Sequence, residues 1–282
     1  MPDLADISIR QHVMAALSED IGHGDATTEA LIASDSSGRA KIIARETLTI
    51  AGVAVAKAVF VELDNEASID AHFEDGEEIQ SGECILTVNA QLRSLLTGER
   101  TALNYLQRLS GIATQSARYV KAVSGTGVLI LDTRKTTPGW RLLEKYAVQC
   151  GGARNHRRGL DDMILIKDNH LAALSSECSI AEAIRRARLI SPDLKIEVEA
   201  ETLDQAQQAT EAGADIVLLD NMTIEELRAA IKLIDGRAQT EGSGGITLET
   251  IREIASTGVN YISAGALTHS ARAVDISMKI ES

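Results

Sequence analysis

Basic side chains that could bind an anion gather in one part of an acidic chain. Arg134 and Lys135 follow one apolar run, and Asn155-His156-Arg157 and Lys167 come later, in a chain with a net charge of −13. Cations that converge in a partly desolvated cleft repel one another, so such a cluster requires a polyanionic ligand. The alternative is a solvated basic loop at residues 156–158. Lys167, however, directly follows the apolar Met163-Ile-Leu-Ile and should point into a cleft.

Two carboxylates occupy comparable positions farther along the chain. Glu199 and Asp220 each lie at or near the end of a segment expected to form a strand. If these strand ends meet at one edge of a sheet, the carboxylates lie opposite the cations. There they could hold ribose hydroxyl groups, or Mg²⁺ with its water ligands. Structural ion pairs are the alternative role for both.

Two glycine-containing segments could bind a phosphate group. Gly242-Ser243-Gly244-Gly245 leads into a helix expected to open at Thr247, and Gly265 to His269 follow the last apolar run. Small residues at a strand-to-helix turn let phosphate oxygens approach backbone N–H groups at the positive end of a helix. A tight turn without a ligand is the alternative. Neither segment has the glycine spacing of a nucleoside triphosphate or dinucleotide loop, which excludes those ligands.

A repeated order of strand, loop and helix must position these residues. Short apolar strands that alternate with helices favour a parallel sheet with crossover connections. The expected strands each end in a polar or glycine residue, and they cover residues 128–133, 163–167, 195–200, 215–220, 239–242 and 260–263. Barrel enzymes carry their active sites at these strand ends. The length of this segment predicts an α/β barrel that is shortened or partly open.

The first part of the chain follows a different pattern. Apolar residues at helical spacing predict a helix from Ile7 to about Leu17. Short strands are expected at residues 38–46, 67–73 and 83–89. Two further helices are expected at residues 91–96 and 99–123.

Composition excludes several classes of function. The negative charge opposes binding to nucleic acid or to anionic membranes, and aromatic residues, at 2%, are too few to stack on single strands. Three dispersed cysteines and a start without a basic, then apolar leader predict a cytoplasmic protein. Residues 75–88 look like half of a biotinyl or lipoyl carrier domain. No lysine lies between Lys57 and Lys121 to carry the cofactor, so the carrier function fails.

Several motifs together resemble those of the quinolinate phosphoribosyltransferase family. They are Asp132-Thr-Arg-Lys-Thr-Thr-Pro138, Glu144-Lys-Tyr-Ala-Val148, Asn155-His-Arg157, Leu165-Ile-Lys-Asp-Asn-His170, Leu219-Asp-Asn221 and Ser243-Gly-Gly-Ile246. Matching motifs in the first half are Glu19-Asp-Ile-Gly-His-Gly-Asp25 and Glu99-Arg-Thr-Ala-Leu-Asn104. The resemblance therefore covers nearly the whole chain.

The resemblance implies a fold, an assembly and a reaction. It implies an N-terminal α/β sandwich domain over residues 1–112 and a shortened α/β barrel over residues 113–282, whose last helix could pack back on the first domain. It also implies a homodimer with shared active sites. The implied reaction joins quinolinate to phosphoribosyl pyrophosphate with Mg²⁺, giving nicotinate mononucleotide, CO₂ and pyrophosphate in NAD biosynthesis.

The same resemblance implies a role for each site residue. Quinolinate would be bound by Arg134, His156 and Arg157, with Thr133 beside them and Arg100 reaching in from the partner subunit. Lys135 and Lys167 would lie between quinolinate and the sugar phosphate. Glu199 and Asp220 would hold the ribose hydroxyls and the metal, directly or through water. The 5′-phosphate would be bound by Ser243, Gly244, Gly245, Gly265 and His269.

The chain departs from the family pattern beside the anion-binding loop. Ala153 and Arg154 stand where the family is usually richer in glycine, and Trp140 stands where a smaller aliphatic residue is common. Two alternatives stay open. One is a related phosphoribosyltransferase with another acceptor, and the other is a non-catalytic binding homologue, which the presence of every required charged residue disfavours.

Overall fold

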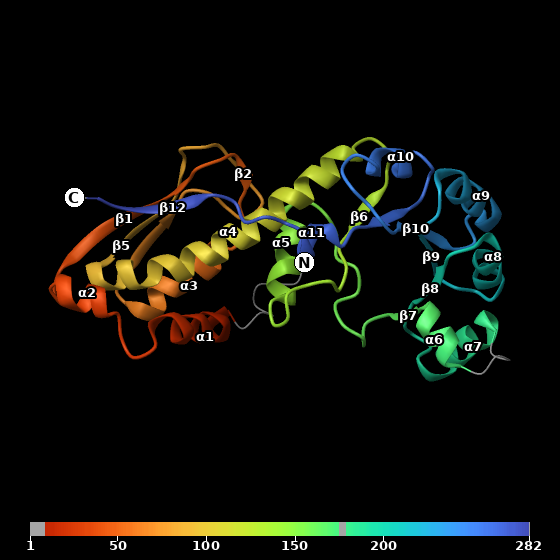
Figure 1. The fold of residues 1–282 in the computed structure, drawn as a ribbon, viewed down its shortest axis with the longest axis horizontal. Helices are drawn as coiled ribbons and strands as arrows, with labels where there is room; N and C mark the ends of the chain where they lie inside the picture. Colours follow the sequence, from red (N-terminus) through yellow and green to blue (C-terminus); the bar gives the residue numbers. More distant parts are fainter. Residues whose placement is uncertain (1–8, 175–178, 282) are drawn as a thin grey trace. The chain divides into compact units, whose positions relative to one another are not determined.

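The computed structural model describes residues 9–174 and 179–281, and Figure 1 shows the course of the chain. The chain forms two compact units, and neither is continuous in sequence. The first unit contains residues 1–117, 137–152 and 270–282, and the second contains residues 118–136 and 153–269. Ile7, the expected start of the first helix, lies outside the described residues.

A four-stranded antiparallel sheet organises the first unit. Its strands, in the order β12-β1-β5-β3, are β12 (Ile276–Glu281), β1 (Ser37–Ala44), β5 (Cys84–Gln91) and β3 (Ser68–Ala71). Ala40, Ile42 and Ala44 of β1 are fully buried and alternate with more exposed residues. This alternation puts one face of the sheet toward the core. Two short strands, β2 (Leu48–Thr49) and β4 (Glu78–Ile79), form a separate ribbon.

The end of the chain is a strand, so the prediction of a last helix there was wrong. β12 runs antiparallel to β1, from Ile276 opposite Ala44 to Glu281 opposite Arg39. Ile276 and Met278 are buried and alternate with more exposed residues. A period of two residues fits a strand and not a helix.

Among the described residues, five helices belong wholly or mainly to the first unit. They are α1 (Ile9–Ile21), α2 (Ala26–Leu31), α3 (Val53–Leu63), α4 (Leu92–Ala122) and α5 (Arg141–Cys150). α4 is continuous where the sequence predicted two helices. A Cβ added at Gly98 in its interior would lie 2.9 Å from Leu63 Cδ1 and 3.2 Å from Phe60 Cε1. Gly98 therefore permits a close approach of α3 and does not break the helix.

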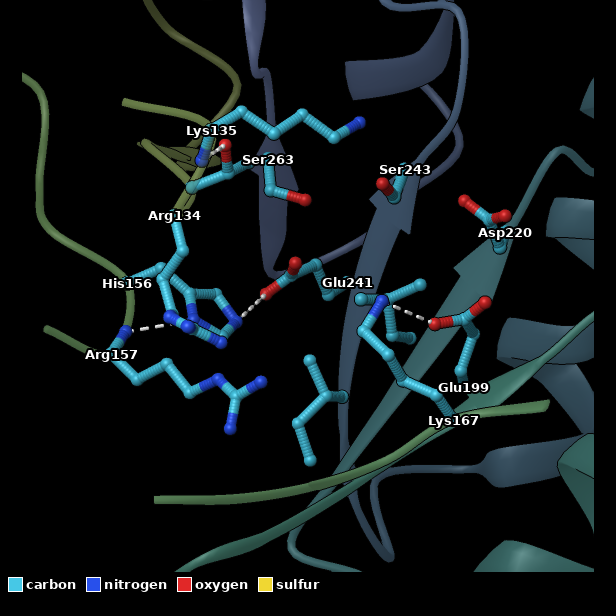
Figure 2. A pocket seen from close by; sticks show the side chains of 13 residues that line it. Arg134, Lys135, His156, Arg157, Lys167, Glu199, Asp220, Glu241, Ser243 and Ser263 are labelled. Atoms are coloured by element: carbon cyan, nitrogen blue, oxygen red, sulfur yellow. Dashed lines mark hydrogen bonds and ion pairs between the residues drawn. The ribbon is translucent and has the colours of Figure 1, made fainter. Parts of the chain in front are cut away.

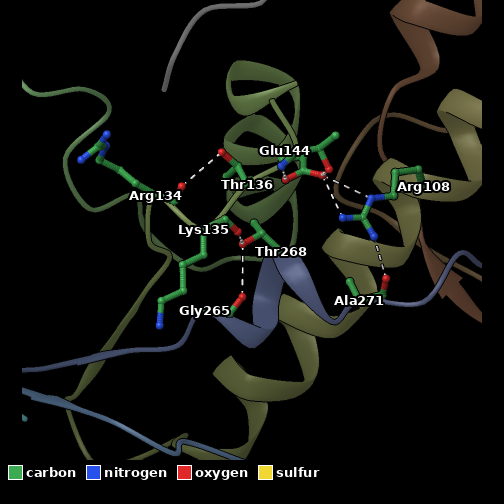
Figure 3. Close-up of polar contacts among 9 residues, drawn as sticks. Arg108, Arg134, Lys135, Thr136, Glu144, Gly265, Thr268 and Ala271 are labelled. Atoms are coloured by element: carbon green, nitrogen blue, oxygen red, sulfur yellow. Dashed lines mark hydrogen bonds and ion pairs between the residues drawn. The ribbon is translucent and has the colours of Figure 1, made fainter. Parts of the chain in front are cut away.

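A buried carboxylate joins three segments of the first unit (Figure 3). Glu144 of α5 is fully buried and accepts hydrogen bonds from Arg108 Nη2 at 2.8 Å and from Thr137 Oγ1 at 2.9 Å. Arg108 Nη1 also donates to the main-chain oxygen of Ala271 at 2.7 Å. A buried charge that keeps its partners avoids the large cost of desolvation. The network thus connects α4, α5 and the segment that leads to β12.

Six parallel strands organise the second unit. They are β6 (Leu129–Leu131), β7 (Ile164–Ile166), β8 (Ile196–Ala200), β9 (Ile216–Asp220), β10 (Gln239–Ser243) and β11 (Tyr261–Ser263). Their spatial order is β6-β11-β10-β9-β8-β7. In the described part of the chain no strand ladder joins β6 to β7, and an isolated parallel bridge links Leu131 to Arg154. The predicted α/β fold with a parallel, partly open sheet is confirmed.

Helices follow these strands in the second unit. They are α6 (Asp168–Ala173), α7 (Ile180–Ile190), α8 (Leu203–Glu211), α9 (Ile224–Ile234), α10 (Ile251–Ala255) and α11 (Ala266–His269). Figure 1 shows α7, α8 and α9 side by side beyond β8 and β9. Thr202 and Thr223 cap α8 and α9, accepting hydrogen bonds from backbone N–H groups of the first turn. Thr247 does not cap α10, which begins after Thr250. Among the described residues there is no helix with the length and apolar character needed to span a membrane.

Candidate active site

The C-terminal ends of the parallel strands surround a pocket of about 370 Å³ in the second unit (Figure 2). Its lining combines cations, carboxylates, hydroxyl groups and two leucines. The lining residues are Thr133, Arg134, Lys135, His156, Arg157, Leu165, Lys167, Glu199, Leu218, Asp220, Glu241, Ser243 and Ser263. The pocket lies where barrel enzymes place their chemistry.

Strand register explains why residues distant in sequence meet here. Paired residues of parallel strands point to the same side of a sheet, and side chains alternate along each strand. Glu199 of β8 and Glu241 of β10 both pair with Leu218 of β9, and Ser243 pairs with Asp220. These side chains therefore share the face that lines the pocket.

The structure brings together most of the predicted site residues but not all of them. Those in the pocket lining are Thr133, Arg134, Lys135, His156, Arg157, Lys167, Glu199, Asp220 and Ser243. Gly244, Gly245, Gly265 and His269 follow strands β10 and β11 without lining the pocket itself. Arg100 lies on α4, in the part assigned to the first unit, and its side chain is exposed.

On one side of the pocket, a lysine faces a pair of carboxylates. Lys167 Nζ lies 2.9 Å from Glu199 Oε2, with 44% of the lysine side chain and 11% of the glutamate side chain exposed. Burial and the nearby charge of Glu199 raise the pKa of Asp220, while Ser243, Lys167 and Lys135 oppose this change. The side of the pocket opposite Arg134 and Arg157 is therefore anionic, and Lys167 offsets part of its charge.

The carboxylates on this side could also hold a metal ion. Oxygens of Glu199, Glu201 and Asp220 lie within 4.8 Å of one another. Carboxylate oxygens and water are the ligands that Mg²⁺ prefers. A dication at this position would relieve the repulsion between Glu199 and Asp220.

Two glycines flank the pocket where a side chain would not fit. Gly244 has a φ of +93°, and a Cβ there would lie 2.1 Å from Asn221 Oδ1. A Cβ at Gly265 would lie 3.0 Å from both His269 Nε2 and Lys135 Cδ. Gly244 therefore requires glycine, whereas a side chain at Gly265 would have to displace the side chains of His269 or Lys135. Small residues at both turns suit phosphate binding by backbone N–H groups.

Hydrogen bonds to neighbouring segments hold the loop that contains His156 and Arg157. Asp132 at the end of β6 is fully buried, and its Oδ1 accepts a 2.8 Å hydrogen bond from the His156 N–H. Arg157 Nη1 donates to the main-chain oxygen of Met163 at 3.3 Å. These contacts fix the loop of residues 155–157 beside Arg134, as Figure 2 shows.

Two buried acids lie close to this loop, and neither was predicted as a site residue. Glu197 is fully buried, and His156 Nε2 lies 2.9 Å from its Oε2. Glu241 is also buried, and its Oε2 lies 3.6 Å from the same nitrogen. The alternation in Ile196-Glu-Val-Glu-Ala200 was the available signal, since Glu197 must share a face with Glu199. Glu201 and Ser263 were also missed.

Comparisons with known proteins agree with this architecture. The model of the quinolinate phosphoribosyl transferase N-terminal domain matches residues 25–110, and that of the C-terminal domain matches residues 112–279. A probable nicotinate-nucleotide pyrophosphorylase (carboxylating) of Bacillus subtilis is 46% identical over 263 residues, covering 93% of this chain and 90% of that protein. A nicotinate-nucleotide pyrophosphorylase (carboxylating) of Mycobacterium leprae is 43% identical over 280 residues, covering 96% of each.

A solved structure extends the likeness to three dimensions. The crystal structure of NadC from Streptococcus pyogenes superposes with a TM-score of 0.94 and 43% sequence identity, covering 99% of this chain and 98% of the other. Sequence and fold thus agree along both domains. The resemblance predicted from the motifs is confirmed, and this chain belongs to the quinolinate phosphoribosyl transferase family.

Proposed function

We propose that this pocket transfers the phosphoribosyl group of phosphoribosyl pyrophosphate to quinolinate, with loss of CO₂. The products are nicotinate mononucleotide and pyrophosphate, and the reaction serves NAD biosynthesis. The observation that carries the proposal is the division of the pocket into two sides. Arg134 and Arg157 lie on one side, and Glu199 and Asp220 lie on the other (Figure 2). The positive charge of the first side complements a dianionic ring, and the negative charge of the second side complements a sugar that becomes cationic during the reaction.

The carboxylates stabilise the transfer step. Departure of pyrophosphate leaves positive charge on the ribose ring, and acidic groups fixed beside it lower the energy of that state. Glu199 and Asp220 would hold the ribose hydroxyl groups there. Mg²⁺ held by these carboxylates, directly or through water, would neutralise charge on the leaving pyrophosphate. Lys135 and Lys167 would lie between the two substrates.

The cations orient the acceptor for loss of CO₂. Bond formation at the pyridine nitrogen makes the ring cationic, so the ring can stabilise the carbanion left when the 2-carboxylate departs. Arg134 and Arg157 would hold the 3-carboxylate most strongly. Pairing the departing 2-carboxylate equally well would stabilise the ground state and slow the reaction.

The phosphate end of the sugar would be bound by the turns after β10 and β11. Ser243, Gly244 and Gly245 follow one strand, and Gly265 and His269 follow the other. Backbone N–H groups at such turns bind phosphate oxygens well. We also include in the proposal a homodimer in which Arg100 completes the site of the partner subunit, and a cytoplasmic location.

Isotope release tests the acceptor. Quinolinate labelled with ¹⁴C at the 2-carboxylate should release labelled CO₂ in step with pyrophosphate, in the presence of phosphoribosyl pyrophosphate and Mg²⁺. Omitting the sugar phosphate should abolish release, because loss of CO₂ requires the alkylated nitrogen. Removing Mg²⁺ with a chelator should also stop turnover. If nicotinate yields pyrophosphate as efficiently as quinolinate does, a related enzyme with another acceptor replaces this proposal.

A further inference from the structure

Two buried carboxyl groups, one of which lines the pocket, have no part in the proposed transfer reaction. Glu197 and Glu241 come from β8 and β10, and their oxygens and a ring nitrogen of His156 lie within 4.8 Å of one another. All four carboxyl oxygens are buried, and none has a hydrogen bond of good geometry with a described residue. The imidazole of His156 lies close to both acids, with Nε2 2.9 Å from Glu197 Oε2 and 3.6 Å from Glu241 Oε2. Leu218 of β9, between the two strands, is apolar.

Contacts within the protein engage both ring nitrogens of His156. The backbone N–H of Arg157 donates to His156 Nδ1 at 2.7 Å, so Nδ1 is an acceptor and carries no proton. The ring proton is then on Nε2, which faces Glu197 and Glu241. The side chain is only 9% exposed. With this geometry His156 has no ring N–H left to donate to a carboxylate of the substrate.

Burial and the adjacent Glu197 raise the pKa of Glu241 to about 8, and His156 opposes this change. The protonated form of Glu241 is therefore favoured at neutral pH. Glu197 acts on the cations above it as well. Burial and the neighbouring Arg134 lower the pKa of Arg157, and Glu197 opposes them.

We propose that Glu197 is a positioning residue that fixes His156 and, through His156 Nδ1, the backbone of Arg157. In this arrangement His156 does not pair with quinolinate. His156 instead connects the buried Glu197 to Arg157, the residue that would bind quinolinate. The proposal rests on the proposed function for the identity of the ligand, but its geometry stands on the contacts of the protein alone.

Kinetics with paired variants tests this role. Glu197→Leu removes the acceptor at similar volume, and we expect the KM for quinolinate to rise about tenfold or more while the KM for phosphoribosyl pyrophosphate changes less than about twofold. Glu197→Gln keeps an oxygen for the Nε2–H and should restore most of the affinity. Glu225→Leu, at an exposed position of α9, controls for the added apolar side chain. A lower KM for quinolinate in Glu197→Leu would show that Glu197 only opposes anion binding, and would overturn the proposal.

A double-mutant cycle separates action through His156 from independent action. His156→Asn keeps an acceptor for the Arg157 N–H but cannot reach Glu197. If Glu197 acts through His156, then Glu197→Leu should add less than about twofold to the KM effect of His156→Asn. Effects that multiply would contradict the proposal.

A spectroscopic measurement keeps this proposal separate from the proposed function. In protein with ¹⁵N-labelled histidine, the resonances that disappear in His156→Asn should show a proton on Nε2, none on Nδ1 and slow exchange with solvent. Exchange should become fast in Glu197→Leu and stay slow in Glu197→Gln. An Nδ1-protonated ring would overturn the positioning role. If the wild-type protein shows the expected resonances but does not convert quinolinate, only the proposed function fails.

Discussion

The hydroxyl group of Thr268 donates a 2.8 Å hydrogen bond to the main-chain oxygen of Lys135, so α11 holds the turn that carries two cations of the pocket (Figure 3). The same hydroxyl lies 3.2 Å from the main-chain oxygen of Gly265. Thr268 is fully buried. One hydroxyl thus fixes the relative positions of Lys135 and the turn expected to bind the 5′-phosphate.

Removing this hydroxyl should weaken catalysis more than its size suggests. Thr268→Val keeps the volume but removes the hydroxyl donor to the main-chain oxygen of Lys135, at a cost of about 0.5–1.5 kcal/mol. We expect kcat/KM for phosphoribosyl pyrophosphate to fall by about tenfold or more. Thr268→Ser retains the hydroxyl and should stay close to wild type. Equal activities of the valine and serine variants in a steady-state assay would show that the hydrogen bond does not position Lys135.

Subunit mixing tests whether the active site is shared. We expect Arg100→Ala and Lys167→Ala proteins each to be nearly inactive, because Lys167 contacts Glu199 within the pocket and Arg100 would come from the partner subunit. Random exchange of the two inactive proteins would place one intact site in each hybrid dimer. Activity should then recover to about a quarter of the wild-type value. Hybrid dimers that form but remain inactive would mean that Arg100 acts in its own chain or is structural.

A methyl group at Gly244 should disturb the pocket through its neighbours. The φ of +93° disfavours any other residue by about 1–2 kcal/mol, and the added Cβ would collide with Asn221. Asn221 Nδ2 donates to Asp220 Oδ2 at 2.7 Å, so the carboxylate should move as well. Gly244→Ala should raise the KM for phosphoribosyl pyrophosphate by roughly tenfold. Gly236→Ala, at a φ of +71° with open space around it, controls for backbone strain alone.

The buried acid Glu241 should make folding stability depend on pH. The native protein keeps this proton up to about pH 8, whereas the unfolded chain releases it near pH 4.5. Between these values the unfolded state binds fewer protons, so stability falls as pH rises.

Glutamine cannot ionise, so the Glu241→Gln variant should not lose stability in this way as the pH rises. Its unfolding free energy should improve relative to wild type by up to about 1.4 kcal/mol per pH unit across the window. Chemical denaturation at several pH values measures the slope. Parallel curves for the two proteins would mean that Glu241 is ionised in the native state.

The sequence by itself determined the fold class, the family and most of the pocket. Alternating strands and helices place polar residues at the ends of parallel strands, and this local rule brought Arg134, Lys167, Glu199 and Asp220 to one edge before any contact was known. The motifs identified the family because they combine unusual residues in a fixed order.

Only the tertiary structure determined which neighbouring groups bury, contact or hydrogen-bond to the functional side chains. The two-residue periodicity at the end of the chain can be read from the sequence, but a strand forms only beside a partner strand. For β12 that partner is β1, which only the tertiary structure identifies. The sequence predicted two helices where α4 is continuous, because the reason for Gly98, the close approach of Leu63 and Phe60, is a contact with another helix. Glu197 and Glu241 read as ordinary acids because charge and burial depend on neighbours distant in sequence. These two acids lie next to His156 only when the three segments that contain them pack against one another.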